Sequence, residues 1–150
     1  MKNKTVYLAI GSNIEPKKNI ALALKELSKI GKIAAISSFI KTRPEGFLNQ
    51  ADFLNGAVKF YTKLTPDALL KELKNIEQIL KRKTPFRNGP RTIDIDIVFY
   101  GNLILKTPLL TIPHPRAEKR FFVLKPLAEI APNKIHPVLK KQVRTLLKKL

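Results

Sequence analysis

The sequence predicts an α+β domain with a ferredoxin-like β-α-β-β-α-β order and C-terminal additions, in which an antiparallel sheet carries its helices on one face. Two segments have apolar residues at helical spacing, and four have the β-branched and aliphatic composition of strands. The two kinds alternate in that order along the chain. Its 150 residues, 44% of them hydrophobic, fit one domain that spans residues 1–150.

The first half contains two strands around one helix. Residues 5–10 are β-branched, aromatic and aliphatic, and the loop Gly-Ser-Asn follows. In residues 16–30 apolar side chains recur at helical spacing with lysines on the other face, and Gly31 ends the pattern. Residues 32–40 again have strand composition and form the second predicted strand.

The second half repeats the pattern after a polar loop. Residues 53–62 are the third predicted strand, and Thr65-Pro66-Asp67 supplies a hydroxyl N-cap, a first-turn proline and an acid. The helix they begin extends to about residue 82, and the fourth strand spans residues 92–99. A short return strand at residues 103–105, a short helix and a basic tail complete the chain.

The composition is strongly basic. Lysine and arginine number 29 against 11 acids, for a formal charge of +18, which favours a polyanionic partner: nucleic acid, a membrane surface or a phosphorylated small molecule. Lysines spread over solvated helix faces are the alternative, although the arginines concentrate between Arg82 and Arg120. No cysteine and no apolar stretch of membrane-spanning length occurs, and the first apolar run covers only residues 6–10, so we expect a cytoplasmic protein.

Two acids stand inside the fourth predicted strand. Because side chains alternate along a strand, Asp94 and Asp96 share one face, roughly 6–7 Å apart, while Ile93, Ile95 and Ile97 enter the core. Two like charges at that distance repel unless a cation lies between them or basic side chains surround them. The pair therefore predicts either a divalent metal site or ion pairs on an exposed sheet face.

The residues before this strand favour the metal. Arg87, Gly89, Pro90 and Arg91 lie on a loop longer than a minimal connector. Arginines beside a carboxylate pair form a set suited to a metal-bound polyphosphate.

The stretch "RNGPRTIDIDIV" closely resembles the signature of the 6-hydroxymethyl-7,8-dihydropterin pyrophosphokinase family of folate biosynthesis. The resemblance extends to "YLAIGSN", "FLNGAV" and "IPHPRAEKRFFVLKPLAEIAP", and thus covers nearly the whole chain in the right order. It implies a ferredoxin-like fold and transfer of pyrophosphate from MgATP to the hydroxymethyl group of the pterin, with release of AMP. ATP and the pterin are then the expected partners of a monomer that binds neither nucleic acid nor membrane.

By that resemblance Asp94 and Asp96 hold two Mg²⁺ ions that bridge the phosphate oxygens. The catalytic set implied is Arg82, Arg91, Asp94 and Asp96. The positions that match ATP contacts are Glu77, Arg82, Arg91, Ile97, Thr111, His114 and Arg120. Such a transfer needs alignment and charge stabilisation more than a strong base, so no general base is assigned.

The positions that match pterin contacts are Thr42, Phe53, Asn55, Asp94 and Phe122. Asn55 matches an amide that reads the ring edge, and Phe122 matches a stacking ring. The segment "TRPEG" aligns with a loop that acts through its backbone, so its side chains are expected to matter little. The loop before Gly-Pro-Arg is one residue short, and Asn88 stands where the family often has tryptophan.

Two other classes of function are alternatives. A basic ferredoxin-like RNA-binding domain is one, because "NGAVKFY" faintly resembles an RNA-recognition motif, but no partner aromatic motif lies on the first strand. A regulatory domain that binds a small molecule without turnover is the other.

Overall fold

A computed structural model describes residues 3–46, 48–80 and 90–150 of the chain. Its strands are β1 (Lys4–Ser12), β2 (Lys32–Ile36), β3 (Ile40–Thr42), β4 (Phe53–Thr62), β5 (Asp94–Tyr100), β6 (Leu105–Lys106) and β7 (Thr111–Ile112). Its α-helices are α1 (Pro16–Leu27), α2 (Pro66–Ile79), α3 (Phe121–Ile130) and α4 (Val143–Lys148), and a 3₁₀ turn covers Ala117–Lys119.

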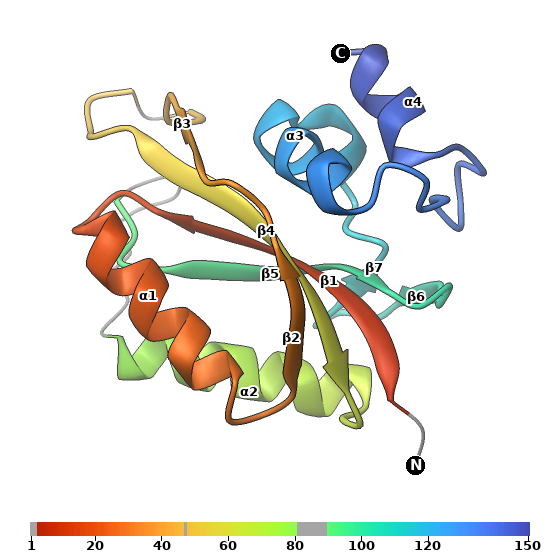
Figure 1. The fold of residues 1–150 in the computed structure, drawn as a ribbon, viewed down its shortest axis with the longest axis horizontal. Coiled ribbons are helices and arrows are strands. Elements are labelled where there is room, and N and C mark those ends of the chain that lie inside the picture. The colour runs from red at the N-terminus through yellow and green to blue at the C-terminus, as the bar shows by residue number, and fades with distance from the viewer. Residues whose placement is uncertain (1–2, 47, 81–89) are drawn as a thin grey trace.

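One antiparallel sheet organises the molecule (Figure 1). Its strands lie in the order β2-β4-β1-β5, and β3 also pairs with β4. Every pairing in this sheet is antiparallel, and β6 and β7 form a separate two-stranded hairpin. The predicted α+β class with an antiparallel sheet is confirmed.

Helices α1 and α2 cover one face of the sheet. Alternate residues of the strands enter this core, as the sequence pattern requires. Its buried members include Val6, Leu8 and Ile10 of β1, Val58 and Phe60 of β4, and Ile93, Ile95 and Ile97. The three isoleucines therefore lie where the alternation predicted, and Asp94 and Asp96 face the opposite side.

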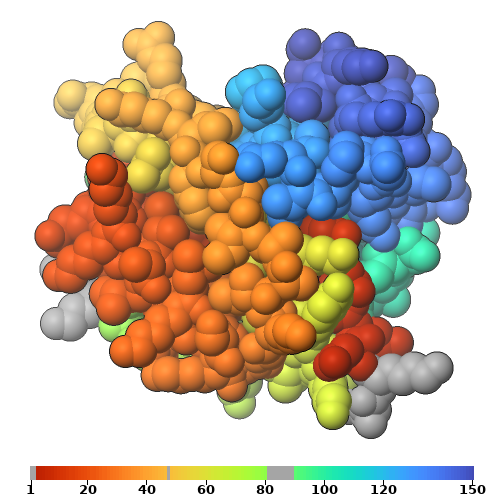
Figure 2. Space-filling model, in the orientation of Figure 1, coloured from red at the N-terminus to blue at the C-terminus, as the bar shows by residue number. Residues whose placement is uncertain are grey.

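The opposite face is covered in part by the C-terminal helices. Tyr7 and Phe99 lie on this face, and they pack against Leu124, Leu127 and Val143 of α3 and α4. The prediction of helices on a single face holds for α1 and α2 but misses this second layer. Figure 2 shows the surface of α3 and α4 pressed against the segment that contains β2 and β3.

The predicted second strand, residues 32–40, is interrupted at Ser37. Its backbone N–H donates to the carbonyl of Ala57 (2.9 Å), and its hydroxyl accepts from the N–H of the same residue (2.8 Å). The next residue, Ser38, donates its N–H and its hydroxyl to the carboxylate of Glu129 on α3 (3.0–3.1 Å). Side-chain groups of Ser37 and Glu129 thus replace backbone groups as hydrogen-bond partners at this point. As a result β2 ends at Ile36, and β3 starts at Ile40.

Other element ends shift by a few residues. Helix α1 ends at Leu27 rather than at residue 30, and β5 begins at Asp94 rather than at residue 92. The return strand lies at Leu105–Lys106, and the expected basic tail includes the short helix α4. Thr65 caps α2 as expected, since its hydroxyl accepts from the N–H of Ala68 (3.3 Å). Within the described ranges, no helix has both the length and the apolar character needed to cross a bilayer.

Candidate active site

Three neighbouring strands form the floor of a pocket on the face opposite α1 and α2. In one row across the sheet, Asn55 of β4 pairs with Gly11 of β1, which pairs with Asp94 of β5. Adjacent strands are about 4.8 Å apart, so the backbones that carry the amide and the carboxylate are separated by roughly 10 Å. Gly11 lies between them and has no side chain. The row therefore leaves an open gap between an amide wall and a carboxylate wall.

The row two residues further along the strands also has small side chains, so the open space extends to Asp96. Ala57, Ala9 and Asp96 pair across the same three strands, so the two strands next to Asp96 contribute only methyl groups to its row. Asp94 and Asp96 are both half-buried and lie on the same side of β5. Small residues in the middle strand and acids in the edge strand thus shape one cavity.

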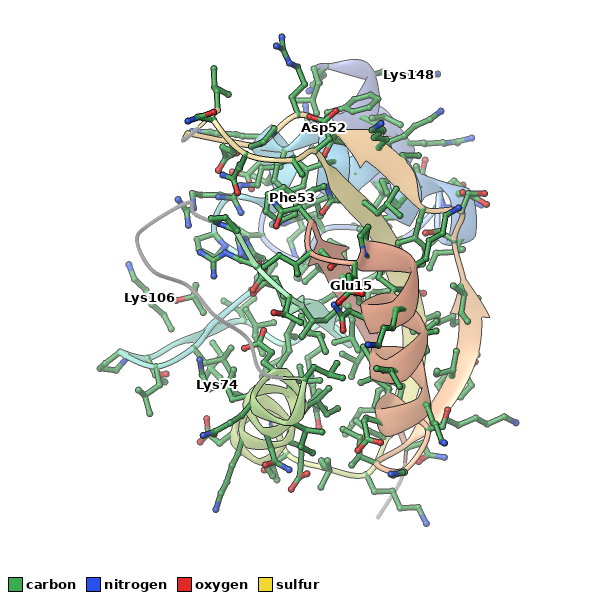
Figure 3. All side chains as sticks on the ribbon, turned by 90° about the vertical axis from the view of Figure 1, so that its left-hand side faces the viewer. Glu15, Asp52, Phe53, Lys74, Lys106 and Lys148 are labelled. Atoms are coloured by element: carbon green, nitrogen blue, oxygen red, sulfur yellow. The ribbon has the colours of Figure 1, made fainter. Side chains whose placement is uncertain are left out.

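This pocket has a volume of about 260 Å³. It brings together nine residues that the sequence predicted for the site: Thr42, Phe53, Asn55, Arg91, Asp94, Asp96, His114, Arg120 and Phe122. They come from β3, β4, β5, the residue segment before β5, the loop after β7 and the start of α3, which are far apart in sequence. Figure 3 labels Phe53 at the start of β4, with Asp52 beside it.

Three predicted residues within the described ranges, Glu77, Ile97 and Thr111, are not among those that line the pocket. Glu77 is buried on α2, where its Oε2 accepts from the N–H of Ile95 (2.9 Å) and so covers the outer edge of β5. Ile97 lies in the core beneath α1 and α2, and Thr111 lies on β7. Arg82 and the loop to Gly89 lie outside the described residues. The nucleotide roles of these three residues and of Arg82 stay predictions.

The amide wall has a fixed orientation. Asn55 Nδ2 donates to Thr42 Oγ1 at 2.6 Å, and the Asn55 side chain is largely buried. A methyl group at Gly11 would lie 2.6 Å from Asn55 Oδ1, closer than a carbon and an oxygen tolerate. The position of the Asn55 amide therefore depends on the Thr42 hydroxyl, which accepts its hydrogen bond, and on Gly11, which leaves room for its oxygen. Phe53 and Phe122 add aromatic rings to the same pocket.

Asn13 positions the backbone that presents Arg91. Its Oδ1 accepts from the N–H of Arg91 (2.8 Å), and its own N–H donates to the Arg91 carbonyl (3.2 Å). Its Nδ2 also donates to the carbonyl of Ala51 (2.9 Å), which ties the same point to the segment before β4. The sequence identified Gly-Ser-Asn only as a loop. A short amide directly after a strand was the available signal for this role.

His114 is held as a neutral donor. Its backbone N–H donates to the carbonyl of Val98 (3.0 Å). Its ring Nδ1 accepts from the backbone N–H of Arg116 (3.2 Å), so the ring proton lies on Nε2. Burial lowers the pKa of His114 to about 4, and the guanidinium groups of Arg120 and Arg116 add to this effect, while Asp94 opposes it. At neutral pH His114 therefore contributes a hydrogen bond rather than a charge.

Three charged residues that line the pocket were missed: Arg43, Glu45 and Arg116. Glu45 pairs with Arg120, with 2.7 Å between Oε1 and Nη2. The prediction that side chains of the 42–46 segment matter little is therefore incomplete. The available signal for Arg116 was its place two residues after His114.

The carboxylates fit a hard divalent ion that also binds substrate. Among the described residues, no group of three or more acid, histidine or cysteine side chains gathers into a metal cage. Asp94 and Asp96 supply two carboxylates on one pocket wall. Mg²⁺ in nucleotide sites takes one or two carboxylates and completes its octahedron with water and substrate phosphate. The donor set matches that demand.

Comparison with known proteins gives one consistent family. The family model described as 7,8-dihydro-6-hydroxymethylpterin-pyrophosphokinase (HPPK) matches residues 7–132. The 2-amino-4-hydroxy-6-hydroxymethyldihydropteridine pyrophosphokinase of Aquifex aeolicus is 43% identical over 93% of this chain and 88% of its own length. The folic acid synthesis protein FOL1 of Dictyostelium discoideum is 49% identical over 91% of this chain, which spans only 21% of that longer protein.

Solved structures agree on the fold. The crystal structure of Plasmodium falciparum HPPK-DHPS wild type with pterin and p-hydroxybenzoate superposes with a TM-score of 0.77 at 19% identity. The match covers 99% of this chain and 43% of that one. At this identity the likeness concerns the fold alone.

Proposed function

Because the chain belongs to the 7,8-dihydro-6-hydroxymethylpterin-pyrophosphokinase family, we propose that its pocket transfers pyrophosphate from MgATP to 6-hydroxymethyl-7,8-dihydropterin and releases AMP. The observation that carries this assignment is the row Asn55–Gly11–Asp94 across three strands. It sets an amide that can read a heterocycle against a carboxylate that can hold a metal, across a gap of about two strand spacings.

The pterin occupies the amide side. Asn55 offers a donor and an acceptor to the ring edge, and Thr42 keeps the amide in one orientation (2.6 Å). Phe53 and Phe122 line the same side and supply aromatic faces for stacking. A flat heterocycle requires such a combination of apolar faces and a few fixed polar groups.

The carboxylate side holds Mg²⁺ with the triphosphate, and we assign two ions to Asp94 and Asp96. When bound, the metal neutralises negative charge on the phosphate oxygens as the transfer proceeds. Both side chains line the pocket, and their number leaves ligand positions for phosphate and water.

Cationic and neutral donors orient the phosphates. Arg91 and Arg120 line the pocket and supply forked N–H donors for phosphate oxygens. His114 adds a donor at Nε2 without a charge, because burial keeps its pKa far below neutrality. Arg82, which lies outside the described residues, and Glu77, Ile97 and Thr111 complete the proposed nucleotide set.

The reaction is a displacement at the β-phosphorus. A bond forms between that phosphorus and the hydroxymethyl oxygen, and the bond to the oxygen that bridges to the α-phosphate breaks. AMP leaves, and the hydroxyl proton passes to water. The residues align the two substrates and stabilise charge, which is the main requirement of phosphoryl chemistry, so no side chain is assigned as general base.

The remaining assignments complete the proposal. The strand order β2-β4-β1-β5 with α1 and α2 on one face supports a ferredoxin-like sheet to which β3 and the C-terminal helices are added. We assign a single domain, a monomer and a cytoplasmic location. The RNA-binding alternative is not supported, because the relatives are pyrophosphokinases and this sheet face presents two carboxylates.

The nucleotide product tests the proposal. Purified protein incubated with MgATP and 6-hydroxymethyl-7,8-dihydropterin should release AMP, with none formed when either the pterin or Mg²⁺ is omitted. Ion-exchange chromatography of the nucleotides separates AMP from ADP. ADP as the pterin-dependent product would exclude pyrophosphoryl transfer.

A further inference from the structure

One contact in the pocket has no role in the reaction described above. Glu45 Oε1 lies 2.7 Å from Arg120 Nη2, and the two residues are 75 positions apart in the chain. The Arg120 side chain is only 15% exposed, whereas that of Glu45 is 48% exposed. A carboxylate on the rim of the pocket thus holds a guanidinium that lies mostly inside it.

Arg120 also interacts with two other pocket residues, Phe122 and His114. Its guanidinium lies over the ring of Phe122, with 5.4 Å between the guanidinium carbon and the ring centroid. It is the larger of the two guanidinium contributions that lower the pKa of His114. Any movement of Arg120 therefore alters both the stacking wall and the neutral donor.

The position of Glu45 opposes nucleotide binding. A triphosphate and a carboxylate both seek the N–H groups of the same guanidinium, and they repel each other when they share it. We propose that Glu45 is a resident counter-ion, which occupies Arg120 in the nucleotide-free protein and is displaced by the nucleotide phosphates. This inference rests on the proposed nucleotide site.

Displacement has a consequence for the pterin side. Glu45 belongs to the segment that follows Thr42, and Thr42 holds the amide of Asn55 (2.6 Å). While the ion pair exists, this segment is tied to the start of α3. Nucleotide phosphates that take over Arg120 release the tie, so the nucleotide side and the pterin side communicate through one ion pair.

The test removes the charge and keeps the shape. In Glu45→Gln the affinity for Mg²⁺ with α,β-methylene ATP, measured by isothermal titration without pterin, should rise about two- to fivefold, as expected for a half-exposed pair. The gain should shrink in 0.5 M KCl, because salt screens the pair. In steady state the KM for ATP should fall. The KM for pterin at saturating ATP and kcat should change less than twofold, because bound nucleotide has then displaced the ion pair in wild-type protein too.

The matched control is Glu26→Gln. Glu26 of α1 forms a pair of equal length with Lys29 (2.7 Å), which lies just after the helix end, and neither residue lines the pocket. Loss of this pair should leave nucleotide affinity unchanged. Amide exchange of a peptide that covers residues 41–46 should accelerate when the analogue binds wild-type protein, and it should already be fast in Glu45→Gln.

Three outcomes would contradict the proposal. Unchanged or weaker nucleotide affinity in Glu45→Gln would overturn the counter-ion role and would instead mean that Glu45 holds Arg120 in its binding position. An equal gain of nucleotide affinity in Glu26→Gln would mean that the gain comes from the change in net charge and not from the loss of the Glu45–Arg120 pair. Absence of nucleotide binding by wild-type protein would overturn the proposed function itself, and the counter-ion with it.

Discussion

Replacement of Gly11 by alanine tests how the sheet shapes the pterin wall. The added methyl would lie 2.6 Å from Asn55 Oδ1, so the amide must retreat by at least about 0.4 Å to reach the shortest contact that real side chains show. The retreat disturbs the 2.6 Å bond from Nδ2 to the hydroxyl of Thr42. Since the amide is the mobile end of a side chain, the fold should be spared, and alanine in a strand regains up to about 1 kcal/mol over glycine.

The loss should therefore appear in ligand affinity. Misplacing a group that pairs with buried donors and acceptors costs about 1–3 kcal/mol, which corresponds to roughly five- to 150-fold weaker pterin binding. Isothermal titration with the pterin in the presence of Mg²⁺ and α,β-methylene ATP measures it. The affinity for the nucleotide alone should change less than twofold, because the amide lies on the opposite side of the gap from Asp94.

A double-mutant cycle separates the mechanisms. Asn55→Ala alone should cost about as much as Gly11→Ala, and the second change should add little in the Asn55→Ala background, because no Oδ1 remains to be displaced. Additive losses would refute the reasoning, since the methyl would then obstruct the ligand directly. Equal losses of nucleotide and pterin affinity in Asn55→Ala would mean that Asn55 supports the fold instead.

The alternation of side chains along β5 made the acidic wall predictable. Three isoleucines on one face and two aspartates on the other depend only on strand geometry, and the structure places all five accordingly. The gap opposite them was not predictable in the same way. It arises because Gly11 and Ala9 fall in the same cross-strand rows as the acids, and register is a property of paired strands.

Long-range side-chain contacts were beyond sequence reasoning for a similar reason. Glu45 and Arg120 meet only because the fold brings the end of β3 to the start of α3. The break after β2 likewise depends on the carboxylate of Glu129 on α3, so residues 32–40 alone predict one continuous strand. Composition could not predict the layer formed by α3 and α4, because short basic segments also form solvated tails.

Two further predictions concern stability. Burial, the largest cause, and the charge of Lys134 lower the pKa of His136, with Glu118 opposing, and its Nδ1 accepts from the N–H groups of Val138 and Leu139 (3.2 and 3.0 Å). The unfolded state then binds a proton more readily than the folded state, so the stabilisation from His136 should be fully present above about pH 6.5 and be lost as the pH falls below it. Urea titrations at several pH values should show that the unfolding free energy of His136→Asn depends less on pH than that of wild-type protein. An equal pH dependence would contradict this role. Thr65→Ala removes the N-cap of α2 and should lower the unfolding free energy by about 1 kcal/mol without changing AMP release. Loss of AMP release would show that the N-cap influences the active site.

Asp94 and Asp96 are proposed to hold metal for catalysis, and this role is tested by pterin-dependent AMP release and melting curves of Asp94→Asn and Asp96→Asn. Each change removes a Mg²⁺ ligand, so the rate should fall at least about a hundredfold, in line with several kcal/mol of charge stabilisation. It also removes repulsion between neighbouring carboxylates, so each variant should melt at the wild-type temperature or above. Variants that melt at lower temperature yet keep most of their AMP release would contradict the claim and would make the two aspartates ion-pairing residues of the fold.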